Sequence, residues 1–576
     1  MSGNYRPRRR YGASGNPKAP KGTGNTGKGN EVSAAAMAAA EGTTPRTGPG
    51  APAGKPGAPR ARNAAGEPAA GRRDKARRGA GFSRPADPRR TAYDVLAAVR
   101  DREAYANLLL PRLLTERQLA GRDAALATEL AYGTLRGQGT YDAVLAACSD
   151  RPLDKLDPPV LDILRLGTHQ LLNTRIGAHA AVATSVDLAK SVVGPRVSGY
   201  VNAVLRRVAT RDLPAWLDIV APDATTDPDG YLATRYSHPR WIVAAYRDAL
   251  GDTADSPAAE VTGGVAATEL EAALAAGSAR PRVTMAAFPA GPPREDVMPA
   301  DAEPGRWSPY AFTLQSGDPA PWTESGVAAV QDEGSQLAAI ALSRAPLLGE
   351  SGGGAERWLD VCAGPGGKSR LLYGLAAGRG ATLTAAELHP HRAALVRDAL
   401  TRASRLSGSS SASARGEQTR DPGAPEPPGT QATEFEVVVA DGTVPPWPDG
   451  TFDRVLVDAP CSGLGALRRR PEARWRKSEA DLGELTALQR ELLRSAVTSV
   501  RPGGVVAYVT CSPVPAETRG VVTDVVTSMP GVDIIDAAAV LSGVPGVSSA
   551  SPLFAQLWPH RHGTDAIFIA LLRRGT

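Results

Sequence analysis

The sequence predicts a multidomain protein with an all-α helical bundle, a small α+β linking domain and an α/β Rossmann-like domain, in that order. Three observations favour this organisation. Apolar residues recur at three- and four-residue spacing in residues 89–212, as they do along amphipathic helices. Residues 213–330 mix helical and strand-like stretches with segments rich in Pro, Gly and Ala. Strands and helices alternate through residues 331–576, which is typical of a parallel sheet covered by helices.

The N-terminal tail, residues 1–88, is predicted to be disordered because it has almost no large apolar residues to bury. It also holds the basic excess of the chain. Residues 1–90 contain 19 Lys and Arg against 5 Asp and Glu, whereas the whole chain contains 66 and 60. Such a tail attracts polyanions without reading their sequence. A solvated tail without a specific partner accounts for the composition equally well.

Cysteine count and hydropathy exclude several classes of protein. The four cysteines have no paired spacing, so we expect neither a disulfide framework nor a zinc site, and no bound metal. No segment approaches the apolar length of a membrane span, and the first residues form no apolar signal region. We therefore expect a reduced, cytoplasmic and monomeric protein with no membrane partner.

The predicted bundle contains seven stretches of helical periodicity with few β-branched runs between them, which favours a compact all-α domain. These stretches span 92–99, 108–114, 124–135, 141–147, 159–172, 179–193 and 197–208. In the linking domain, Pro239 is predicted to lie in the first turn of a helix and residues 281–285 to form a short strand. His238 is interpreted as a capping or packing residue rather than a catalyst.

Seven strands are predicted in the C-terminal domain, 331–576, from short apolar runs bounded by turn residues. They span 357–362, 381–387, 435–440, 452–458, 504–510, 532–535 and 566–572. The segment 403–433 is rich in Ser, Gly, Pro and Arg, so we predict a disordered surface insertion before the third strand.

A glycine-rich loop follows the first of these strands and leads into a helix. Glycines in this position allow the backbone to approach a ligand closely. The spacing of the lysine is too short for a phosphate-binding loop, and the glycines do not match the dinucleotide fingerprint. The loop consists of Cys362, Ala363, Gly364, Pro365, Gly366, Gly367 and Lys368.

Acidic residues end the next three strands, at Glu387, Asp441 and Asp458. An acid about twenty residues past such a loop can hold a pair of ribose hydroxyls. Successive carboxylates would repel a phosphate-rich ligand, so the set favours an adenosyl ligand, and S-adenosylmethionine is the cofactor that we predict. Each acid taken singly could equally be a turn or cap residue.

Two cysteines each follow an apolar run that predicts a buried strand. Cys461 stands in the motif Asp-Ala-Pro-Cys-Ser-Gly, and Cys511 in Thr-Cys-Ser-Pro. The carboxyl ends of strands in an open sheet meet at one crevice, so we expect the two thiols to converge. The alternative is a pair of inert buried thiols, which is the usual state of free cysteine.

These motifs resemble the Nop/Sun family of RNA 5-methylcytosine methyltransferases, and specifically its RsmB type. The resemblance covers residues 89–576. It rests on the glycine loop, on both cysteine motifs and on residues 330–336 at the entrance to the catalytic domain. The helical region resembles the NusB-like RNA-binding domain through residues 90–96 and 199–207.

The resemblance implies a methyltransferase that modifies carbon 5 of a cytosine in small-subunit (16S) ribosomal RNA. In this chemistry a thiolate adds to carbon 6 and makes carbon 5 nucleophilic. The family implies that Cys511 is the nucleophile, that Cys461 assists product release and that Asp458 lies beside both the base and the cofactor. Glu387 and Asp441 would hold the ribose and adenine, and the glycine loop would bind the rest of the cofactor.

The chain departs from the family pattern at three places. Glu387 stands where Asp is commoner, residues 563–568 replace an Asp-Gly-Phe-Phe motif, and residues 281–284 lack an expected Asn. Glu387 can still accept hydrogen bonds from a ribose. The change at 563–568 leaves the contact to the target base unassigned, and the change at 281–284 leaves RNA contacts in the linking domain unassigned. The basic segment 468–477, with Trp475 among its Arg and Lys residues, is predicted to contact RNA, although most charge runs are simply solvated.

Three alternatives remain at this point. The same chemistry could act on another RNA, such as tRNA or 23S rRNA. A DNA cytosine methyltransferase would use Cys461 alone and carry a Glu-Asn-Val motif that the sequence lacks. A non-catalytic NusB-like RNA-binding factor would account for residues 89–212 but leave the glycine loop and both thiols unexplained.

Overall fold

The computed structural model describes residues 87–251, 262–349, 354–413, 434–548 and 553–576. The predicted disorder of residues 1–88 and most of the predicted insertion 403–433 lie outside these ranges. The start of the insertion is wrong, because residues 403–413 continue helix α15 (Pro390–Ser413). Ala403 and Leu406 still pack on the core there, so burial extends the helix into a sequence of low apolar content.

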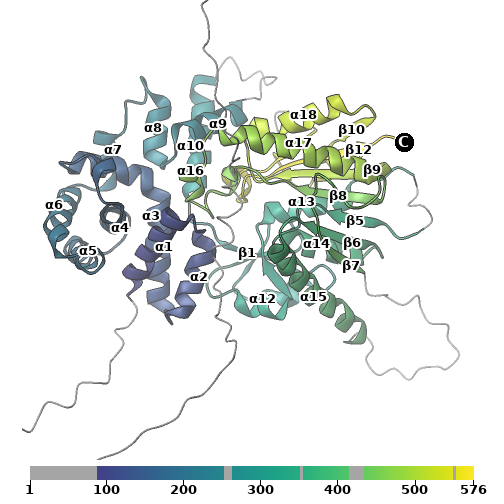
Figure 1. Cartoon of the computed structure of the whole chain (residues 1–576), viewed down its shortest axis with the longest axis horizontal. Coiled ribbons are helices and arrows are strands. Elements are labelled where there is room, and N and C mark those ends of the chain that lie inside the picture. The colour runs from purple at the N-terminus through teal and green to yellow at the C-terminus, as the bar shows by residue number, and fades with distance from the viewer. Residues whose placement is uncertain (1–86, 252–261, 350–353, 414–433, 549–552) are drawn as a thin grey trace, which may run out of the picture. The chain divides into compact units, whose positions relative to one another are not determined.

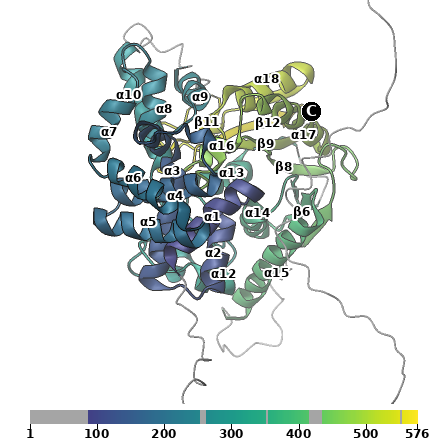
Figure 2. The same cartoon turned by 60° about the vertical axis from the view of Figure 1, so that its left-hand side comes forward.

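Six helices form the N-terminal bundle (Figure 2), and they enclose one apolar core. They are α1 (Pro88–Arg102), α2 (Ala106–Glu116), α3 (Gly121–Cys148), α4 (Pro158–Asn173), α5 (Ala178–Val192) and α6 (Ser198–Val208). The predicted stretches 124–135 and 141–147 are one continuous helix, α3. Gly137 and Gly139 do not end it, because side chains pack where their Cβ atoms would lie: the Tyr141 ring and the Trp475 indole respectively.

The linking region begins with four helices and continues into a four-stranded antiparallel sheet with the order β2-β3-β1-β4, which has two short helices between its strands. His238, which precedes the third of these helices, is buried against the Tyr246 ring, as expected for a packing residue, and burial holds its pKa well below the usual value. The elements are α7 (Leu213–Val220), α8 (Pro228–Tyr236), α9 (Arg240–Gly251), α10 (Thr262–Ser278), β1 (Val283–Ala287), α11 (Arg294–Val297), β2 (Glu303–Pro304), β3 (Ala311–Leu314), α12 (Ala320–Ser325) and β4 (Ala328–Val330).

The C-terminal sheet has eight strands, and each of the seven predicted strands is present. Its order is β10-β12-β9-β8-β5-β6-β7, and the short β11 pairs with β12. The strands are β5 (Arg357–Asp360), β6 (Thr382–Glu387), β7 (Phe435–Val439), β8 (Phe452–Asp458), β9 (Val500–Thr510), β10 (Val532–Ile535), β11 (Ala555–Gln556) and β12 (Phe568–Arg574).

The sheet is mixed rather than wholly parallel as predicted. Strands β7, β6, β5, β8 and β9 are parallel, but β12 runs antiparallel between β9 and β10. Apolar periodicity reveals that a strand exists but not its direction, which explains the difference. The chain order reverses between β5 and β8, and ligands of open α/β sheets bind outside the carboxyl ends of the strands at such a point.

Helices cover both faces of this sheet (Figure 1) and bury two apolar cores, one on each side. One core includes side chains of α13 (Glu333–Arg344), α14 (Gly367–Ala377) and α15. The other includes side chains of α17 (Asp481–Ser499) and α18 (Arg519–Ser528). Three four-residue helices complete the domain: α16 (Ala473–Arg476), α19 (Ala537–Val540) and α20 (Pro559–His562). In the part of the chain that the structure describes, no helix combines the length and apolarity that a membrane crossing requires.

Arg474 in α16 joins the catalytic domain to the helices that precede it. Its guanidinium is buried and donates hydrogen bonds to backbone carbonyls of Ser237 (2.8 Å), Arg136 (3.2 Å) and Gly277 (3.4 Å). Burial lowers the pKa of Arg474 to about 10. One buried side chain therefore hydrogen-bonds to three segments of the chain.

A buried carboxyl group, Asp360, ends strand β5 beneath the glycine loop. Its Oδ2 accepts a hydrogen bond from the Ser369 hydroxyl at 2.7 Å. Burial raises the pKa of Asp360 to about 7; the Ser369 hydrogen bond opposes this shift, and the nearby Asp458 charge adds to it. The acid is therefore partly protonated near neutral pH.

Replacing Arg474 by Leu should lower the free energy of unfolding by about 3 kcal/mol, because buried carbonyls lose charged hydrogen-bond donors. Urea unfolding followed by circular dichroism would measure the change. Arg490→Leu is the matched control: its partly exposed ion pair with Asp524 should contribute less than about 1 kcal/mol. Equal losses in the two variants would contradict the role given to Arg474.

Asp360→Asn should remove a pH dependence of stability. The folded-state pKa of about 7 exceeds the ordinary value of 3.8, so the stability that protonated Asp360 contributes is complete below pH 3.8 and is lost as the pH rises through 7. Asn keeps an acceptor for Ser369 but cannot ionise. From pH 4 to pH 8 the variant should gain stability relative to the wild type, by at most about 4 kcal/mol. Urea unfolding at several pH values would test this, with the exposed Asp533→Asn as control.

Candidate active site

The structure brings the two predicted thiols together at the carboxyl ends of β8 and β9. These neighbouring parallel strands are in register with Asp458 opposite Val509, so the turns that follow them begin side by side. The Sγ atoms of Cys461 and Cys511 lie 3.3 Å apart. This separation allows both sulfurs to reach one substrate atom or its neighbour.

The surroundings of the two thiols make Cys511 the more acidic one. The hydrogen bond between the two sulfurs lowers the pKa of Cys511; burial and Asp458 oppose this, and the charges of Lys368 and Arg470 add to it. The same hydrogen bond raises the pKa of Cys461, and burial, Cys511 and Glu517 raise it further. Of the two thiols, Cys511 is therefore the one that ionises more readily.

Lys368 and Asp458 form an ion pair beside the thiols, with Nζ 2.8 Å from Oδ2. Burial disfavours the ammonium, but Asp458, Cys511 and Asp360 outweigh it, so the pKa of Lys368 is raised. The pair combines a permanent proton donor with a carboxylate at the point where the strand order reverses. It can supply a hydrogen bond or a proton to a polar atom of a substrate ring.

The glycine loop leads from β5 into α14 and packs closely against neighbouring residues at two of its glycines. A Cβ atom at Gly364 would lie 2.2 Å from Oε2 of Glu387, so only glycine fits there. Gly366 has a φ of 107°, in the region that favours glycine. The loop thus places backbone close to the end of β6.

Glu387 ends β6 and faces the glycine loop. Its Oε2 accepts a hydrogen bond from the Gly364 N–H and its Oε1 one from the His389 N–H, each at 3.0 Å. Arg392 lies 3.5 Å from the same carboxylate. The carboxylate is buried and held in place by these groups, which is the arrangement that a ribose acceptor needs.

Asp441 follows β7 and is exposed. Its Oδ1 accepts hydrogen bonds from the Thr443 N–H (2.9 Å) and hydroxyl (2.7 Å), so it caps its own turn. Apolar side chains stand near both acids in the chain: Leu388, 54% exposed, follows Glu387, and Val444, 75% exposed, follows Asp441 by three residues. Exposed apolar side chains next to carboxylates suit an adenosine, which has an apolar ring face and polar edges.

These residues fit S-adenosylmethionine. Gly364 lets the loop backbone approach Glu387, whose carboxylate oxygens would accept from ribose hydroxyls, and Leu388 and Val444 would offer apolar surface to the adenine. When bound, the cofactor supplies an electrophilic methyl group. In the described ranges no cluster of His, Cys, Asp or Glu side chains is arranged to hold a metal ion.

The prediction that segment 468–477 contacts RNA is wrong for several of its residues. Arg468 and Arg469 are turned inward and form ion pairs with Asp332 and Asp565 at 2.6–3.0 Å. Arg474 is buried, as described above. The charges of Arg468, Arg469 and Arg474 form contacts within the protein, and the sequence could not reveal this because the partner acids lie 97 and 136 residues away from Arg468.

Several residues near the site were missed by sequence reasoning. Asp360 lies within the predicted strand 357–362 and was given no role of its own, and Leu388 and Val444 gave no signal beyond their proximity to the predicted acids. Glu517, six residues after Cys511, is wholly buried and hydrogen-bonds to the residue that follows each thiol. An acid in a Pro-rich turn gives no sequence signal of burial.

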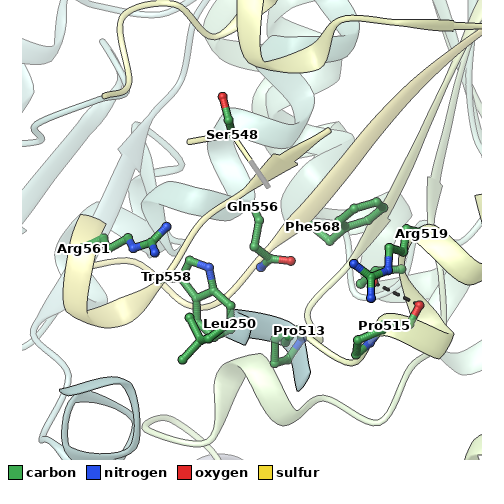
Figure 3. A pocket seen from close by; sticks show the side chains of 11 residues that line it. Leu250, Pro513, Pro515, Arg519, Ser548, Gln556, Trp558, Arg561 and Phe568 are labelled. Atoms are coloured by element: carbon green, nitrogen blue, oxygen red, sulfur yellow. Dashed lines mark hydrogen bonds between the residues drawn. The ribbon is translucent and has the colours of Figure 1, made fainter. Parts of the chain in front are cut away.

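Two cavities border the turn that follows Cys511, on the side facing α9. Figure 3 shows the smaller, about 40 Å³, with Pro513, Pro515, Arg519 and Trp558 among its lining residues. The larger, about 660 Å³, shares Pro515 and Arg519 with it and extends along α9. None of the predicted site residues lines either cavity. Both cavities lie beside the segment that follows Cys511, away from the thiols themselves.

Comparison with known proteins agrees with this geometry. The NusB family model matches residues 86–210, and the model described as 16S rRNA methyltransferase RsmB/F matches residues 429–573. A protein of Mycobacterium tuberculosis strain H37Rv, provisionally named a methyltransferase, is 47% identical over 498 residues, which are 86% of this chain and 98% of that protein. Ribosomal RNA small subunit methyltransferase B of Pseudomonas putida is 29% identical over 499 residues, 84% of this chain and 98% of that protein.

A solved structure shows the same fold. The crystal structure of PH0851 superposes with a TM-score of 0.63 at 20% sequence identity and covers 85% of this chain and 99% of its own. The matched RsmB/F segment contains both thiols, Asp458 and Glu517. The chain therefore belongs to the RsmB/F family of S-adenosylmethionine-dependent RNA methyltransferases and carries a NusB-family domain before its catalytic domain.

Proposed function

We propose that this protein methylates carbon 5 of a cytosine in 16S ribosomal RNA through a covalent adduct between Cys511 and carbon 6. The observation that carries the proposal is the pair of thiols 3.3 Å apart, of which Cys511 has the lowered pKa and Cys461 the raised pKa. Covalent catalysis of this kind needs one thiolate to attack and a second group to help the product leave.

The first step is attack on carbon 6. The Cys511 thiolate forms the S–C6 bond, and the electrons of the C5=C6 double bond move toward N3, which takes a proton or a hydrogen bond from the Lys368–Asp458 pair. Carbon 5 then has enamine character and can accept the methyl group of the cofactor. The ion pair fixes Asp458 between the thiols and the glycine loop, where the base and the cofactor would meet.

The second half restores the aromatic ring. A base removes the proton from carbon 5, the electron pair re-forms the C5=C6 bond, and Cys511 leaves as a thiolate. A proton taken by N3 in the first step returns to the Lys368–Asp458 pair. We assign the base to Cys461. The Cys511 charge is one cause of the raised Cys461 pKa, and that charge disappears once Cys511 is bonded to carbon. Cys461 can therefore ionise in the adduct and accept the carbon 5 proton.

We also propose the remaining site and domain assignments. Glu387 and Asp441 hold the ribose and adenine, and residues 362–368 bind the rest of the cofactor. Residues 89–212 act as a NusB-like RNA-binding domain, 213–330 as a linking domain and 331–576 as the methyltransferase domain. The relative from Pseudomonas putida is named for small-subunit ribosomal RNA, which supports 16S rRNA over tRNA or 23S rRNA. A DNA substrate would leave Cys511 without a role.

The substrate is tested by bisulfite sequencing of RNA from a strain that lacks the gene. We expect one 5-methylcytosine signal to disappear from 16S rRNA and to return when the wild-type gene is restored. Restoring the gene with Cys511→Ser is the control and should not recover the signal. Loss of a signal from tRNA or 23S rRNA, with 16S rRNA unchanged, would refute the 16S assignment and leave the chemistry intact.

The two thiols should fail in different ways when mutated. Cys511→Ser cannot form the adduct and should be inactive without attaching to RNA. Cys461→Ala should still attack carbon 6 but fail to release, so a covalent protein–RNA species should accumulate in the presence of the cofactor. Denaturing electrophoresis would detect that species, which should be absent from the double variant. An adduct with Cys511→Ser and none with Cys461→Ala would reverse the two roles.

A further inference from the structure

Glu517 occupies a central position beneath the thiol pair. It ends the short 3-10 helix Pro515–Glu517, which follows the Cys511 turn, and its side chain has no solvent exposure. The Tyr508 hydroxyl donates a hydrogen bond to its backbone carbonyl at 2.8 Å and thereby ties it to strand β9. A carboxylate in such a place is costly unless donors surround it.

Four donors converge on the Glu517 carboxylate from three segments of the chain. Oε1 accepts from the Ser462 N–H (2.7 Å) and from Gln489 Nε2 (3.1 Å). Oε2 accepts from the Ser462 hydroxyl (2.5 Å) and the Ser512 hydroxyl (2.6 Å). An ionised carboxylate is an acceptor only, and these donors use its full capacity.

The two serines connect this carboxylate to the thiols, because each serine directly follows one of the two cysteines. Ser462 follows Cys461 and Ser512 follows Cys511, and their hydroxyl oxygens lie 3.2 Å apart. One rigid group thus fixes both turns relative to each other. A change in either turn would move its sulfur with respect to the other.

Gln489 of α17 supports the same arrangement from the opposite side. Its Nε2 donates to Glu517 and also, at 2.8 Å, to the carbonyl of Pro460, the residue before Cys461. Gln489 has no solvent exposure. The turn that carries Cys461 is therefore held both before and after the cysteine by one connected network.

The charge of Glu517 bears on the two thiols unequally. Among the ion pairs found in the described residues, none includes Glu517, so its charge meets N–H and O–H dipoles rather than a cation. It disfavours a second negative charge at Cys461. The charged groups on the Cys511 side are different: Lys368 and Asp458 from α14 and β8, and Arg470.

We propose that Glu517 is the positioning residue of the thiol pair: it holds the turns of Cys461 and Cys511 in register and places a carboxylate beside the Cys461 turn. It touches neither substrate nor cofactor and acts through Ser462, Ser512 and Gln489. Its catalytic consequence rests on the proposed covalent mechanism, whereas the placement and ionisation of the thiols are properties of the protein alone.

The first test needs no RNA. In a Cys511→Ser background, the alkylation of Cys461 by iodoacetamide is followed by mass spectrometry as a function of pH, with and without Glu517→Gln. Lys368, Asp458 and Arg470 are the same in both proteins, so only the Glu517 charge changes. The apparent pKa of Cys461 should fall when that charge is removed. Identical pH profiles would overturn the electrostatic part of the proposal.

Geometry is tested with phenylarsine oxide, which binds two thiols held close together. Wild-type protein should bind one equivalent and lose it in Cys461→Ala or Cys511→Ser. Glu517→Gln should bind phenylarsine oxide more weakly than the wild type. Glu517→Asp keeps the charge on a shorter side chain, so its affinity should lie between those of the wild type and Glu517→Gln. Asp524→Asn, an exposed acid on the adjacent helix α18, is the matched control and should bind as the wild type does. Unaltered binding by Glu517→Gln would overturn the positioning role.

The catalytic consequence is measured in a Cys461→Ala background, where the RNA adduct accumulates. Adding Glu517→Gln should slow adduct formation by about 10²-fold, the loss typical of a displaced reacting group. Calorimetry with S-adenosylhomocysteine should show unchanged affinity, which establishes that the variant is folded. No adduct in Cys461→Ala alone would refute the proposed function. Equal adduct rates with and without Glu517→Gln would refute the role of Glu517 and leave the function intact.

Discussion

The parallel pairing of β8 with β9 is the constraint on which the site depends. Cys461 and Cys511 are fifty residues apart in the chain, and they meet only because Asp458 lies opposite Val509 in the ladder. A slip of one residue would move one turn along the strand by about 3.3 Å and point its side chains to the other face of the sheet. The buried apolar side chains of both strands exclude such a slip.

Charged and polar side chains inside this protein connect segments that are distant in the sequence. Arg468 and Arg469 meet Asp332 and Asp565, while Tyr246 of α9 donates a hydrogen bond to the Leu464 carbonyl at 2.6 Å. The segment after Cys461 is therefore fixed on several sides by elements from the linking region and from the C-terminus. A buried ion pair contributes little net stability, but removing one partner is costly, so these contacts specify one arrangement.

The sequence predicted most of the fold because burial leaves a periodic pattern. The predicted strands 435–440 and 532–535 correspond to β7 and β10 within one residue. The antiparallel direction of β12 was not predictable, since a period of two residues has no direction. The continuity of α3 through Gly137 and Gly139 was missed as well, because glycine weakens a helix locally and the Trp475 ring that packs on Gly139 comes from a distant part of the chain.

Within the site, sequence reasoning named residues that stand in local motifs and missed those whose contacts come from distant parts of the chain. The glycine loop, Glu387, Asp458 and both thiols stand in local motifs, so residue order alone indicated them. The burial of Glu517 and the inward turn of Arg468 depend on partners 55 and 97 residues away, and no local pattern records such distances. Sequence reasoning therefore located the chemistry better than the contacts that hold it.

The packing of Trp475 over Gly139 has a consequence for how this chain can be recombined with its relatives. A Cβ atom at position 139 would lie 2.6 Å from the indole, so the helical segment must present a bare backbone where the catalytic segment presents a large ring. A chimaera that takes its front half from one protein and its back half from another would place a side chain against that ring unless both positions were inherited together. Positions 139 and 475 are thus coupled across the two halves of the chain.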